Sequence, residues 1–329
     1  MKRTELGRTG TTVSQVALGC MLMGTYTDEP TSYRMLDSYL DVGGDFLDSA
    51  NCYAWWHAGS DGGESEELLG RWLARGDRDR VVLATKVGGI VTDVPAALAS
   101  GKADWDVAAR HFEGAGADVV RRGIDASLRR LGTDHVDLYY VHVDDLATPL
   151  EETLEALDGV VRAGKARHIG WSNVRTERLE RIRELTERHG WTAPVAVQQQ
   201  HSYLRPRPGI DRAGIAGPAL FDHLAAHEDL TLVAYSPILQ GIYDDPDRRA
   251  AHGTWDTYAG PDSEARLAVV AEVAADLGAT GNQVALAWLL RQTPAVVPIV
   301  GTRTWEQFEA FLGALDVELG DDHLAALGT

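Results

Sequence analysis

The sequence DFLDSANCY, at residues 45–53, joins a short apolar run to a carboxylate and, five residues later, to a tyrosine. Such a run is typical of a buried parallel strand, which carries a polar side chain at its carboxyl end to the mouth of a pocket. Two later apolar runs end in the same way, at Lys86 and at His142. These strand ends supply one candidate acid–base set, namely Asp48, Tyr53, Lys86 and His142.

The chemistry of this set suits proton transfer without a metal. A lysine beside a phenol stabilises the phenolate and lowers the pKa of the phenol, while a carboxylate keeps the lysine charged. We therefore expect Tyr53 to be a proton donor near neutral pH. Each residue alone also has a structural explanation, because an Asp can cap a loop, a Tyr can pack and a His can bond to a backbone carbonyl. Their coincidence at successive strand ends favours the functional interpretation.

The same alternation of apolar runs and amphipathic segments extends along the chain. Uninterrupted apolar runs indicate strands buried on both faces, and the segments between them indicate crossover helices. Eight such strands predict an α/β fold with a closed (β/α)8 TIM barrel, as one domain over residues 1–329. The predicted strands are Val16–Leu18, Asp45–Asp48, Val81–Thr85, Val136–Val141, Ala166–Trp171, Ala196–Gln198, Leu232–Tyr235 and Val296–Val300. The predicted helices are Thr31–Val42, Glu64–Arg75, Ala117–Leu131, Leu150–Ala163, Thr176–Arg188, Pro218–His227, Glu264–Leu277 and Thr304–Leu315, with an inserted helix at Gly281–Arg291.

Segments outside this repeat add a hairpin and long loops. Lys2–Leu6 and Thr12–Ser14, separated by the turn sequence GRTG, predict an N-terminal β-hairpin that caps the bottom of the barrel. Three long βα loops fall on the opposite face, where the active sites of this fold lie. They exceed what a bare connection needs, so we expect them to contact substrate or cofactor. They are Val87–Gly116, His201–Gly217 and Gly241–Asp262.

Composition excludes several classes of partner. A net charge of −18 argues against a nucleic-acid surface, which needs clustered Lys and Arg. The two cysteines, Cys20 and Cys52, favour free thiols in a reducing cytosol and have no spacing for a metal site. The chain has no signal-peptide pattern and no apolar stretch long enough for a bilayer. We expect a cytoplasmic protein without a membrane partner, and the sequence leaves the oligomeric state open.

One motif is a false match. Residues 159–165, GVVRAGK, fit most of a phosphate-binding P-loop. A P-loop requires a strand before it and a Ser or Thr after the lysine, whereas here a predicted helix precedes it and Ala166 follows. Gly164 is better explained as a helix C-cap. No GxGxxG sequence follows a predicted strand, so a doubly wound dinucleotide-binding domain has no support.

Taken together, the motifs resemble the aldo-keto reductase superfamily, from near Lys2 to Leu327. The motifs that carry the resemblance, in order, are LGRTG at 6–10, FLDSA at 46–50 with Tyr53, GESE at 63–66, TK at 85–86, VDLY at 136–139 with His142, IGWSN at 169–173, AYSP at 234–237 and PIVGTR at 298–303. The resemblance implies a (β/α)8 barrel that binds NADP(H) in an extended form without a Rossmann fold. NAD(H) remains a possible cofactor.

The resemblance also implies roles for individual residues. Tyr53 would be the general acid/base, Lys86 and Asp48 would tune it, and His142 would orient the carbonyl. Three polar side chains would hold the nicotinamide carboxamide, namely Ser172, Asn173 and Gln198. Further cofactor-binding positions would be Tyr235, which stacks on the nicotinamide ring, Ser236 and Leu239 along the pyrophosphate, Gly241, Gly301, and Arg303 with Gln307 at the 2′-phosphate.

Three departures from the family pattern limit these roles. Phe311 stands where many members place an Asn that contacts the adenine. Gly301 stands where some members use a lysine for the phosphate, which puts more weight on Arg303. The aromatic, glycine-rich residues 54–63 follow the tyrosine and are expected to shape the substrate pocket. Core packing remains an alternative for Tyr235, and a solvated helix start remains an alternative for Arg303.

The expected function is reduction of an aldehyde or ketone, such as a sugar, to an alcohol, or the reverse oxidation. The substrate wall is expected to include aromatic side chains, because these pack sugar rings and apolar aldehydes alike. Two alternatives are a cofactor-binding regulatory subunit with little catalysis, and a barrel enzyme acting on phosphate-bearing substrates without nicotinamide. The candidates for the wall are Trp55, Trp56, His57, Trp105 and Tyr203.

Overall fold

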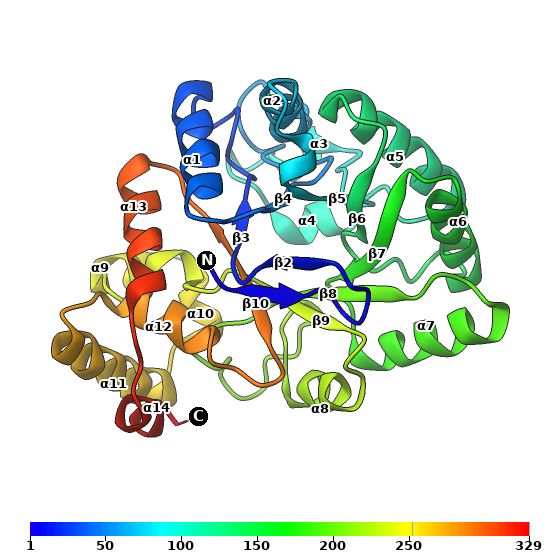
Figure 1. Cartoon of the computed structure of the whole chain (residues 1–329). Coiled ribbons are helices and arrows are strands. Elements are labelled where there is room, and N and C mark those ends of the chain that lie inside the picture. Colours follow the sequence, from blue (N-terminus) through cyan, green and yellow to red (C-terminus); the bar gives the residue numbers. More distant parts are fainter. Residues whose placement is uncertain (252, 329) are drawn as a thin grey trace.

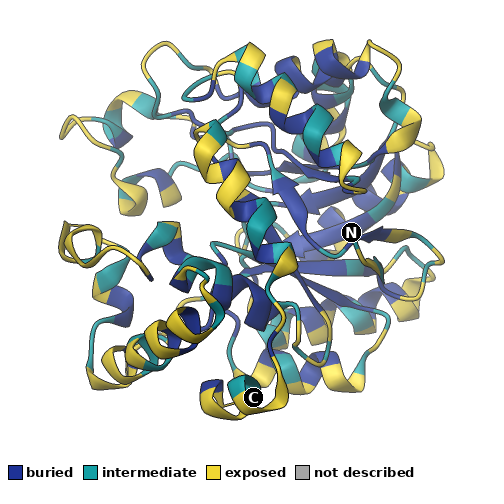
Figure 2. Ribbon diagram, turned by 60° about the vertical axis from the view of Figure 1, so that its left-hand side comes forward, coloured by how far each residue is buried: buried dark blue, intermediate teal, exposed yellow. Residues whose placement is uncertain are grey.

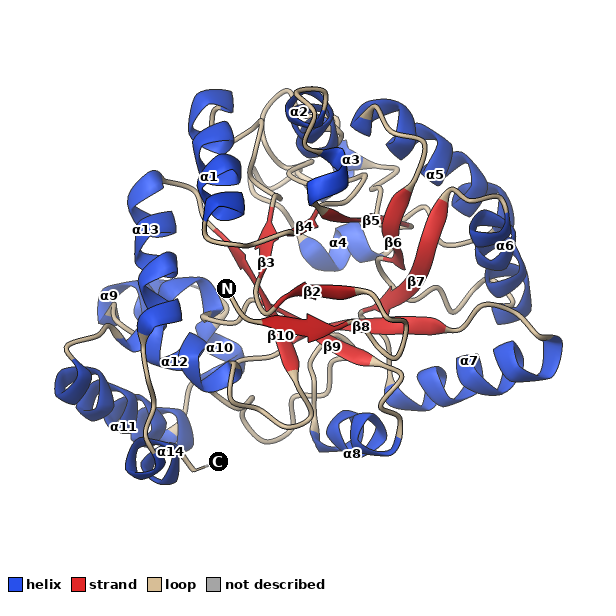
Figure 3. Ribbon diagram, viewed as in Figure 1, coloured by secondary structure: helices blue, strands red, loops and turns tan. Residues whose placement is uncertain are grey.

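The computed structural model of the protein describes residues 1–251 and 253–328, and its centre is a closed barrel of eight parallel strands. The strand order is β10-β3-β4-β5-β6-β7-β8-β9, so each strand pairs with its neighbour in the chain and the last closes on the first. Figure 3 shows the strands in the middle with helices around them. The strands are β3 (Ala17–Gly19), β4 (Phe46–Asp48), β5 (Val82–Val87), β6 (Val136–Val141), β7 (Ala166–Ser172), β8 (Pro194–Gln200), β9 (Thr231–Tyr235) and β10 (Val296–Gly301).

Helices cover the outside of the barrel, as the sequence predicts. In Figure 2 the strands are buried, while the outward faces of the helices are exposed. The (β/α)8 prediction is confirmed. The main helices are α1 (Glu29–Asp41), α2 (Glu64–Leu73), α5 (Ala117–Leu131), α6 (Leu150–Arg162), α7 (Thr176–His189), α8 (Pro218–Ala226), α11 (Pro261–Leu277), α12 (Gly281–Leu289) and α13 (Trp305–Gly313). Shorter pieces are α3 (Val94–Ala97), α4 (Trp105–Ala109), α9 (Pro246–Ala251), α10 (Trp255–Tyr258), α14 (Asp321–Leu327) and the 3-10 turns η1 (Arg78–Arg80), η2 (Leu239–Gly241) and η3 (Ala314–Asp316).

Alternation along the strands decides which side chains enter the barrel. Ala84 of β5 and Tyr140 of β6 belong to the cluster that fills the interior, whereas Leu83 and Tyr139 pack outward against the helices. Because side chains two residues apart point to the same face of a strand, the next inward positions are Lys86 and His142. Phe46 lies inside in the same way and directs Asp48 inward. The two-residue alternation along the strands thus directs three polar side chains, those of Asp48, Lys86 and His142, to the same end of the barrel.

An antiparallel hairpin closes the other end. It consists of β1 (Arg3–Glu5) and β2 (Thr12–Ser14), and Figure 1 shows it lying across the barrel. Leu6 and Val13 are fully buried in the interior cluster. The backbone N–H of Gly7 donates to Thr231 Oγ1 at 2.7 Å, at the start of β9. The hairpin therefore plugs the N-terminal end of the strands.

The boundaries differ from the predictions where local signals are weak. Strand β5 continues to Val87, so Lys86 lies within the strand rather than at its end. Helix α11 begins at Pro261 instead of Glu264, because a proline fits the first helical turn, where its missing N–H has no partner to lose. The long loops are not bare, since α3 and α4 lie in the first, and α9 and α10 in the third.

Within the described residues no helix has the length and apolar character that a membrane crossing requires.

Candidate active site

Lys86 is the hub of a polar cluster at the C-terminal end of the barrel. Its Nζ donates to both Asp48 carboxylate oxygens at 2.6 Å, to the Ser49 carbonyl at 2.7 Å and to Tyr53 Oη at 2.5 Å. The Lys86 and Asp48 side chains are buried. An ion pair enclosed in this way is screened little by solvent, so its field acts strongly on the phenol.

Neighbouring strands and a tight turn bring these groups together. Asp48 is level with Ala84 on β5, and Lys86 is level with Tyr140 on β6. Tyr53 comes from the turn after β4, where the next residue, Ala54, is held at a φ of 57° and is fully buried. A left-handed conformation is costly for a residue other than glycine and persists only where the surroundings enforce it. The phenol is thereby fixed above the lysine.

The direction of the pKa shift of Tyr53 differs from the sequence expectation. Burial, followed by the nearby charge of Asp48, raises the pKa of the Tyr53 phenol well above its ordinary value instead of lowering it. Burial also raises the pKa of the Asp48 carboxyl, and Lys86 acts in the opposite direction. The phenol is therefore neutral at physiological pH. This is the proton-carrying form that a general acid needs, with an ammonium bonded to the oxygen that would become negative.

His142 lies edge-on to Tyr53, with ring centroids 5.6 Å apart. Burial, aided by the Lys86 charge, lowers the pKa of His142 to about 3, so its imidazole is neutral. Its Nδ1 is 3.3 Å from the Sγ of Cys52, and its backbone carbonyl accepts a bond of 2.8 Å from Asn173 Nδ2. A neutral imidazole with one nitrogen engaged can offer the other to a ligand.

The GESE sequence at 63–66 braces this cluster from outside the barrel. Ser65 Oγ is bonded to Ser49 Oγ and to the Cys20 carbonyl, both at 2.8 Å. Glu66 is fully buried, accepts from Thr85 Oγ1 at 2.5 Å and pairs with Arg130 at 2.6 Å. Because Thr85 precedes Lys86, this chain of bonds holds the strand that presents the lysine. In the sequence, the signal for this role is a glutamate that shares the buried face of α2 with Leu69 and Leu73.

The three residues expected at the carboxamide are linked, because the backbone N–H of Asn173 donates to the Gln198 carbonyl at 3.3 Å. Gln198 Nε2 donates to the two Asp48 oxygens at 3.1 and 3.2 Å. Asn173 Nδ2 donates to Ser172 Oγ at 3.1 Å, and Asn173 Oδ1 accepts from Tyr235 Oη at 2.8 Å. Tyr235 itself is half-buried. The ends of β7, β8 and β9 are therefore linked to the Lys86 cluster.

Unusual backbone conformations gather at the same ends. In the described chain the non-glycine residues with positive φ are Ala54, Asn173, Ser236, Leu239 and Gln240, with values from 46° to 61°. Gly241 follows with a φ of 86°. Strained conformations of this kind cluster at ligand-binding and catalytic sites. Their position after β4, β7 and β9 supports a binding site at this end of the barrel.

The expected phosphate-binding residues lie at the start of α13. The Arg303 guanidinium stacks over the Tyr26 ring at 5.1 Å and forms no ion pair with a described residue. Gln307 Oε1 accepts from the backbone N–H of Arg303 at 2.8 Å, so part of this side chain caps the helix. Gly301 is exposed at the end of β10, and Phe311 is buried against Phe308. Among the residues expected at the phosphate, Arg303 therefore carries a positive charge that no described carboxylate pairs with.

The aromatic residues expected at the substrate divide into three environments. Trp55 is buried in a small core with residues of the first long loop, whereas Trp56 is half-buried. Trp105 of α4 is 54% exposed and lies against both, with centroids 5.5 and 5.2 Å away. His57 packs edge-on against Tyr26 at 4.7 Å. Tyr203 is buried in the main core against Trp288, so its contacts give no support to a substrate role.

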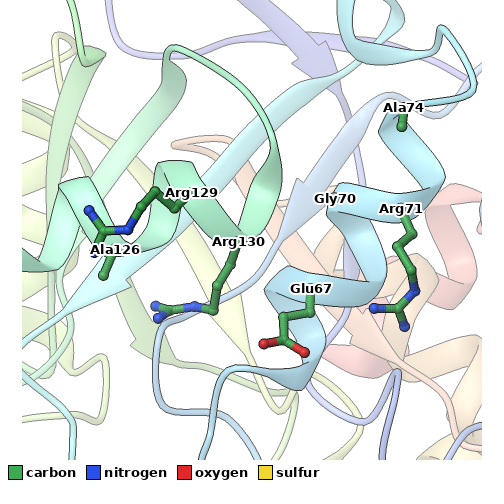
Figure 4. A pocket seen from close by; sticks show the side chains of 7 residues that line it. All are labelled: Glu67, Gly70, Arg71, Ala74, Ala126, Arg129 and Arg130. Carbon is green, nitrogen blue, oxygen red and sulfur yellow. The ribbon is translucent and has the colours of Figure 1, made fainter.

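A separate surface depression lies between α2 and α5, on the outer side of the barrel (Figure 4). Its walls carry Glu67, Arg71 and Arg129. The two helices meet closely here, because a Cβ on Gly70 would stand 2.1 Å from the Arg130 carbonyl. None of the acid–base residues line the depression. It is a shallow groove on the outer side of the contact between α2 and α5.

Comparisons with known proteins point to one family. The model of the Aldo/keto reductase family matches residues 15–328. The chain is 34% identical to Uncharacterized oxidoreductase YrpG of Bacillus subtilis, covering 99% of this chain and 95% of that protein. It is 32% identical to norsolorinic acid reductase stcV of Emericella nidulans, covering 96% and 77% respectively. It is 30% identical to aldo-keto reductase yakc [NADP(+)] of Schizosaccharomyces pombe, covering 94% and 86%.

A solved structure supports the same assignment. A thermostable aldo-keto reductase crystallised with the inhibitor epalrestat superposes with a TM-score of 0.72 at 26% identity, covering 99% of this chain and 98% of that one. The chain belongs to the aldo/keto reductase family, whose members are NAD(P)H-dependent oxidoreductases.

Proposed function

We propose that this aldo/keto reductase uses NADPH to reduce the carbonyl group of an aldehyde or ketone to an alcohol, with Tyr53 as the general acid. The observation that carries the proposal is the part-buried bond of 2.5 Å from Lys86 Nζ to Tyr53 Oη, together with the buried ion pair of the same ammonium with Asp48. A neutral phenol with a cation fixed at its oxygen is ready to lose a proton to a developing alkoxide.

The protein residues would act in a fixed order. His142 donates a hydrogen bond to the carbonyl oxygen and orients it, and Tyr53 transfers its proton from Oη to that oxygen as negative charge develops there. The remaining phenolate is stabilised by Lys86, which Asp48 holds in place. The nicotinamide cofactor, when bound, supplies the hydride. Positioning and charge stabilisation account for much of the rate in such a step.

The donor set at the strand ends fits a nicotinamide cofactor. Ser172, Asn173 and Gln198 carry the hydroxyl and amide groups that a carboxamide can bond with, and the Tyr235 ring lies beside them. The positive-φ turn at residues 239–241 follows β9 on the same end of the barrel and is the proposed path of the pyrophosphate. Arg303, whose guanidinium forms no ion pair with a described residue, favours a 2′-phosphate, and hence NADPH over NADH. A relative that carries NADP(+) in its name supports the same choice.

The aromatic cluster is the proposed substrate wall, with Trp56 and Trp105 as its members. Both retain accessible surface in loops at the face where this fold binds its substrates. Relatives named norsolorinic acid reductase and versiconal hemiacetal acetate reductase support a carbonyl-containing substrate class. A regulatory subunit without catalysis would not need the intact arrangement of Tyr53, Lys86, Asp48 and His142.

The test is a kinetic assay with a matched variant. The purified protein is mixed with NADPH and a panel of aldehydes, ketones and sugars, and cofactor oxidation is followed by absorbance. We expect Tyr53→Phe to lower turnover by roughly 10²-fold or more, because it removes the proton donor. NADPH binding, followed by fluorescence, should be retained. Absence of turnover with every carbonyl, or near-normal turnover in the variant, would contradict the proposal.

A further inference from the structure

The buried thiol of Cys52 contacts the imidazole of His142. Cys52 Sγ is 3.3 Å from His142 Nδ1, and Cys52 immediately precedes Tyr53. The contact is enclosed by Gly89, where an added Cβ would stand 2.8 Å from Nδ1 and 3.0 Å from Sγ. The lack of a side chain at Gly89 therefore leaves room for the sulfur and the ring to meet.

The charge states of the two groups define the kind of bond. Burial raises the pKa of the Cys52 thiol to about 12, so the sulfur keeps its proton. Burial and the Lys86 charge lower the pKa of His142 to about 3, so the ring carries a single N–H. With one proton on the sulfur and one on the ring, two hydrogen bonds are possible. Either the thiol donates to Nδ1, or Nδ1–H donates to the sulfur.

The relative acceptor strengths select the first arrangement. A thiol sulfur is a weak acceptor, whereas the unprotonated imidazole nitrogen is a good one. A bond from S–H to Nδ1 leaves the ring proton on Nε2. Nε2 has no hydrogen-bond partner among the described residues, and the ring is only half-buried. This nitrogen is therefore available to a ligand.

We infer that Cys52 is a positioning residue for carbonyl reduction, whose S–H bond to Nδ1 holds the proton of neutral His142 on Nε2. The inference rests on the proposed function. A carbonyl oxygen and the alkoxide that forms from it both accept hydrogen bonds, so the nitrogen that meets them has to be a donor. The opposite tautomer would present a lone pair to the substrate oxygen and repel it. One bond to the far nitrogen thus selects the useful tautomer.

The direct test is nitrogen NMR of the histidine rings in the intact protein without substrate. Protein labelled with 15N-histidine gives ring cross-peaks that distinguish Nε2–H from Nδ1–H, and His142→Gln identifies the peaks of His142. We expect the neutral Nε2–H form in the wild-type protein. Cys52→Val, whose side chain is close to cysteine in size but has no hydrogen-bond donor, should give a mixture of tautomers. Cys52→Ser, whose hydroxyl can donate, should restore the Nε2–H form.

Kinetics give a second, independent measurement. Loss of one neutral hydrogen bond predicts a two- to roughly tenfold slower single-turnover reduction in Cys52→Val, with NADPH affinity unchanged and partial recovery in Cys52→Ser. Cys20→Ala is the matched control, because Cys20 Sγ contacts the Leu18 carbonyl at 3.5 Å instead of His142. It should leave the His142 tautomer as in the wild type.

The outcomes separate this inference from the proposed function. An Nδ1–H tautomer in the wild-type protein would overturn the role of Cys52, even if carbonyl reduction is observed. So would a Cys52→Val variant that keeps both the tautomer and the reduction rate. Conversely, a wild-type protein that shows the Nε2–H form but turns over no carbonyl would count against the proposed function alone.

Discussion

At the level of single residues, burial decides the chemistry of the site more than sequence proximity does. The sequence places a lysine near a tyrosine, and this alone predicts a lowered phenol pKa. In the structure desolvation of the half-buried Tyr53 side chain, followed by the Asp48 charge, raises the pKa of the phenol instead. The error has a physical origin, because desolvation depends on every neighbour around Tyr53 and none of these can be counted from the sequence. The expected proximity of the two side chains is confirmed, since Lys86 donates directly to the phenol oxygen.

The role of Lys86 can be measured through pH dependence. Because its ammonium favours the phenolate, Lys86→Met should raise the pKa of Tyr53 further. Alcohol oxidation needs the phenolate as base, so its rate should begin to rise at a higher pH in the variant than in the wild type. Lys165→Met, which removes a surface lysine paired with Asp125, should leave the profile in place. An unchanged profile in Lys86→Met, or a shift to lower pH, would assign Lys86 another role.

Arg303 provides the test of cofactor choice. Its guanidinium lacks an ion-pair partner among the described residues, and a charge-assisted contact with a phosphate contributes about 1.5–3 kcal/mol. Arg303→Ala should therefore weaken NADPH by roughly 10- to 100-fold in Kd and NADH little. Arg34→Ala is the control, since Arg34 stacks on Trp305 in the same region. Equal losses for both cofactors in Arg303→Ala, or a native preference for NADH, would refute the phosphate assignment.

At the level of helices and strands, regular repeats were predictable and short capped turns were not. The period of two in β5 and β6 fixes which residues face inward, and this pattern is visible in the sequence. Helix α4 has no such period. It forms because Asp104 accepts from the backbone N–H groups of Asp106 and Val107, a local bond that many loop aspartates could make. The helices inside the long loops were missed for this reason.

The indole cluster allows the roles of two adjacent residues to be separated. Trp55 is buried with Val91, Ala97 and Ala108, so Trp55→Ala should lower the melting temperature and cost about 3–5 kcal/mol of stability. Trp56 is half-buried, and Trp56→Ala should instead change KM among carbonyl substrates more than it changes NADPH affinity. If Trp56→Ala lowers the melting temperature without altering substrate preference, the wall has to be formed by the long loops without it.

Across the whole molecule, the two ends of the barrel have different tasks. At one end the interior holds Asp48, Lys86 and Gln198, whose mutual bonds stabilise the buried charges of the ion pair. At the other end it holds Leu6 and Val13 from the hairpin, which bury apolar surface. Active sites of this fold lie at the C-terminal ends of the strands, and the opposite end contributes stability. The hairpin should therefore matter for folding and little for chemistry.

Leu6→Ala tests this separation. Leu6 is fully buried in the barrel interior, so its truncation should cost about 2–5 kcal/mol in the free energy of unfolding, measured with denaturant. Leu146→Ala, at a side chain that is 80% exposed, should change stability by less than about 0.5 kcal/mol. At a temperature where Leu6→Ala remains folded, its kcat for carbonyl reduction should match the wild type, because the Lys86 cluster lies at the other end of the barrel. A large fall in kcat in the folded variant would mean that the hairpin transmits strain through the interior side chains to the site.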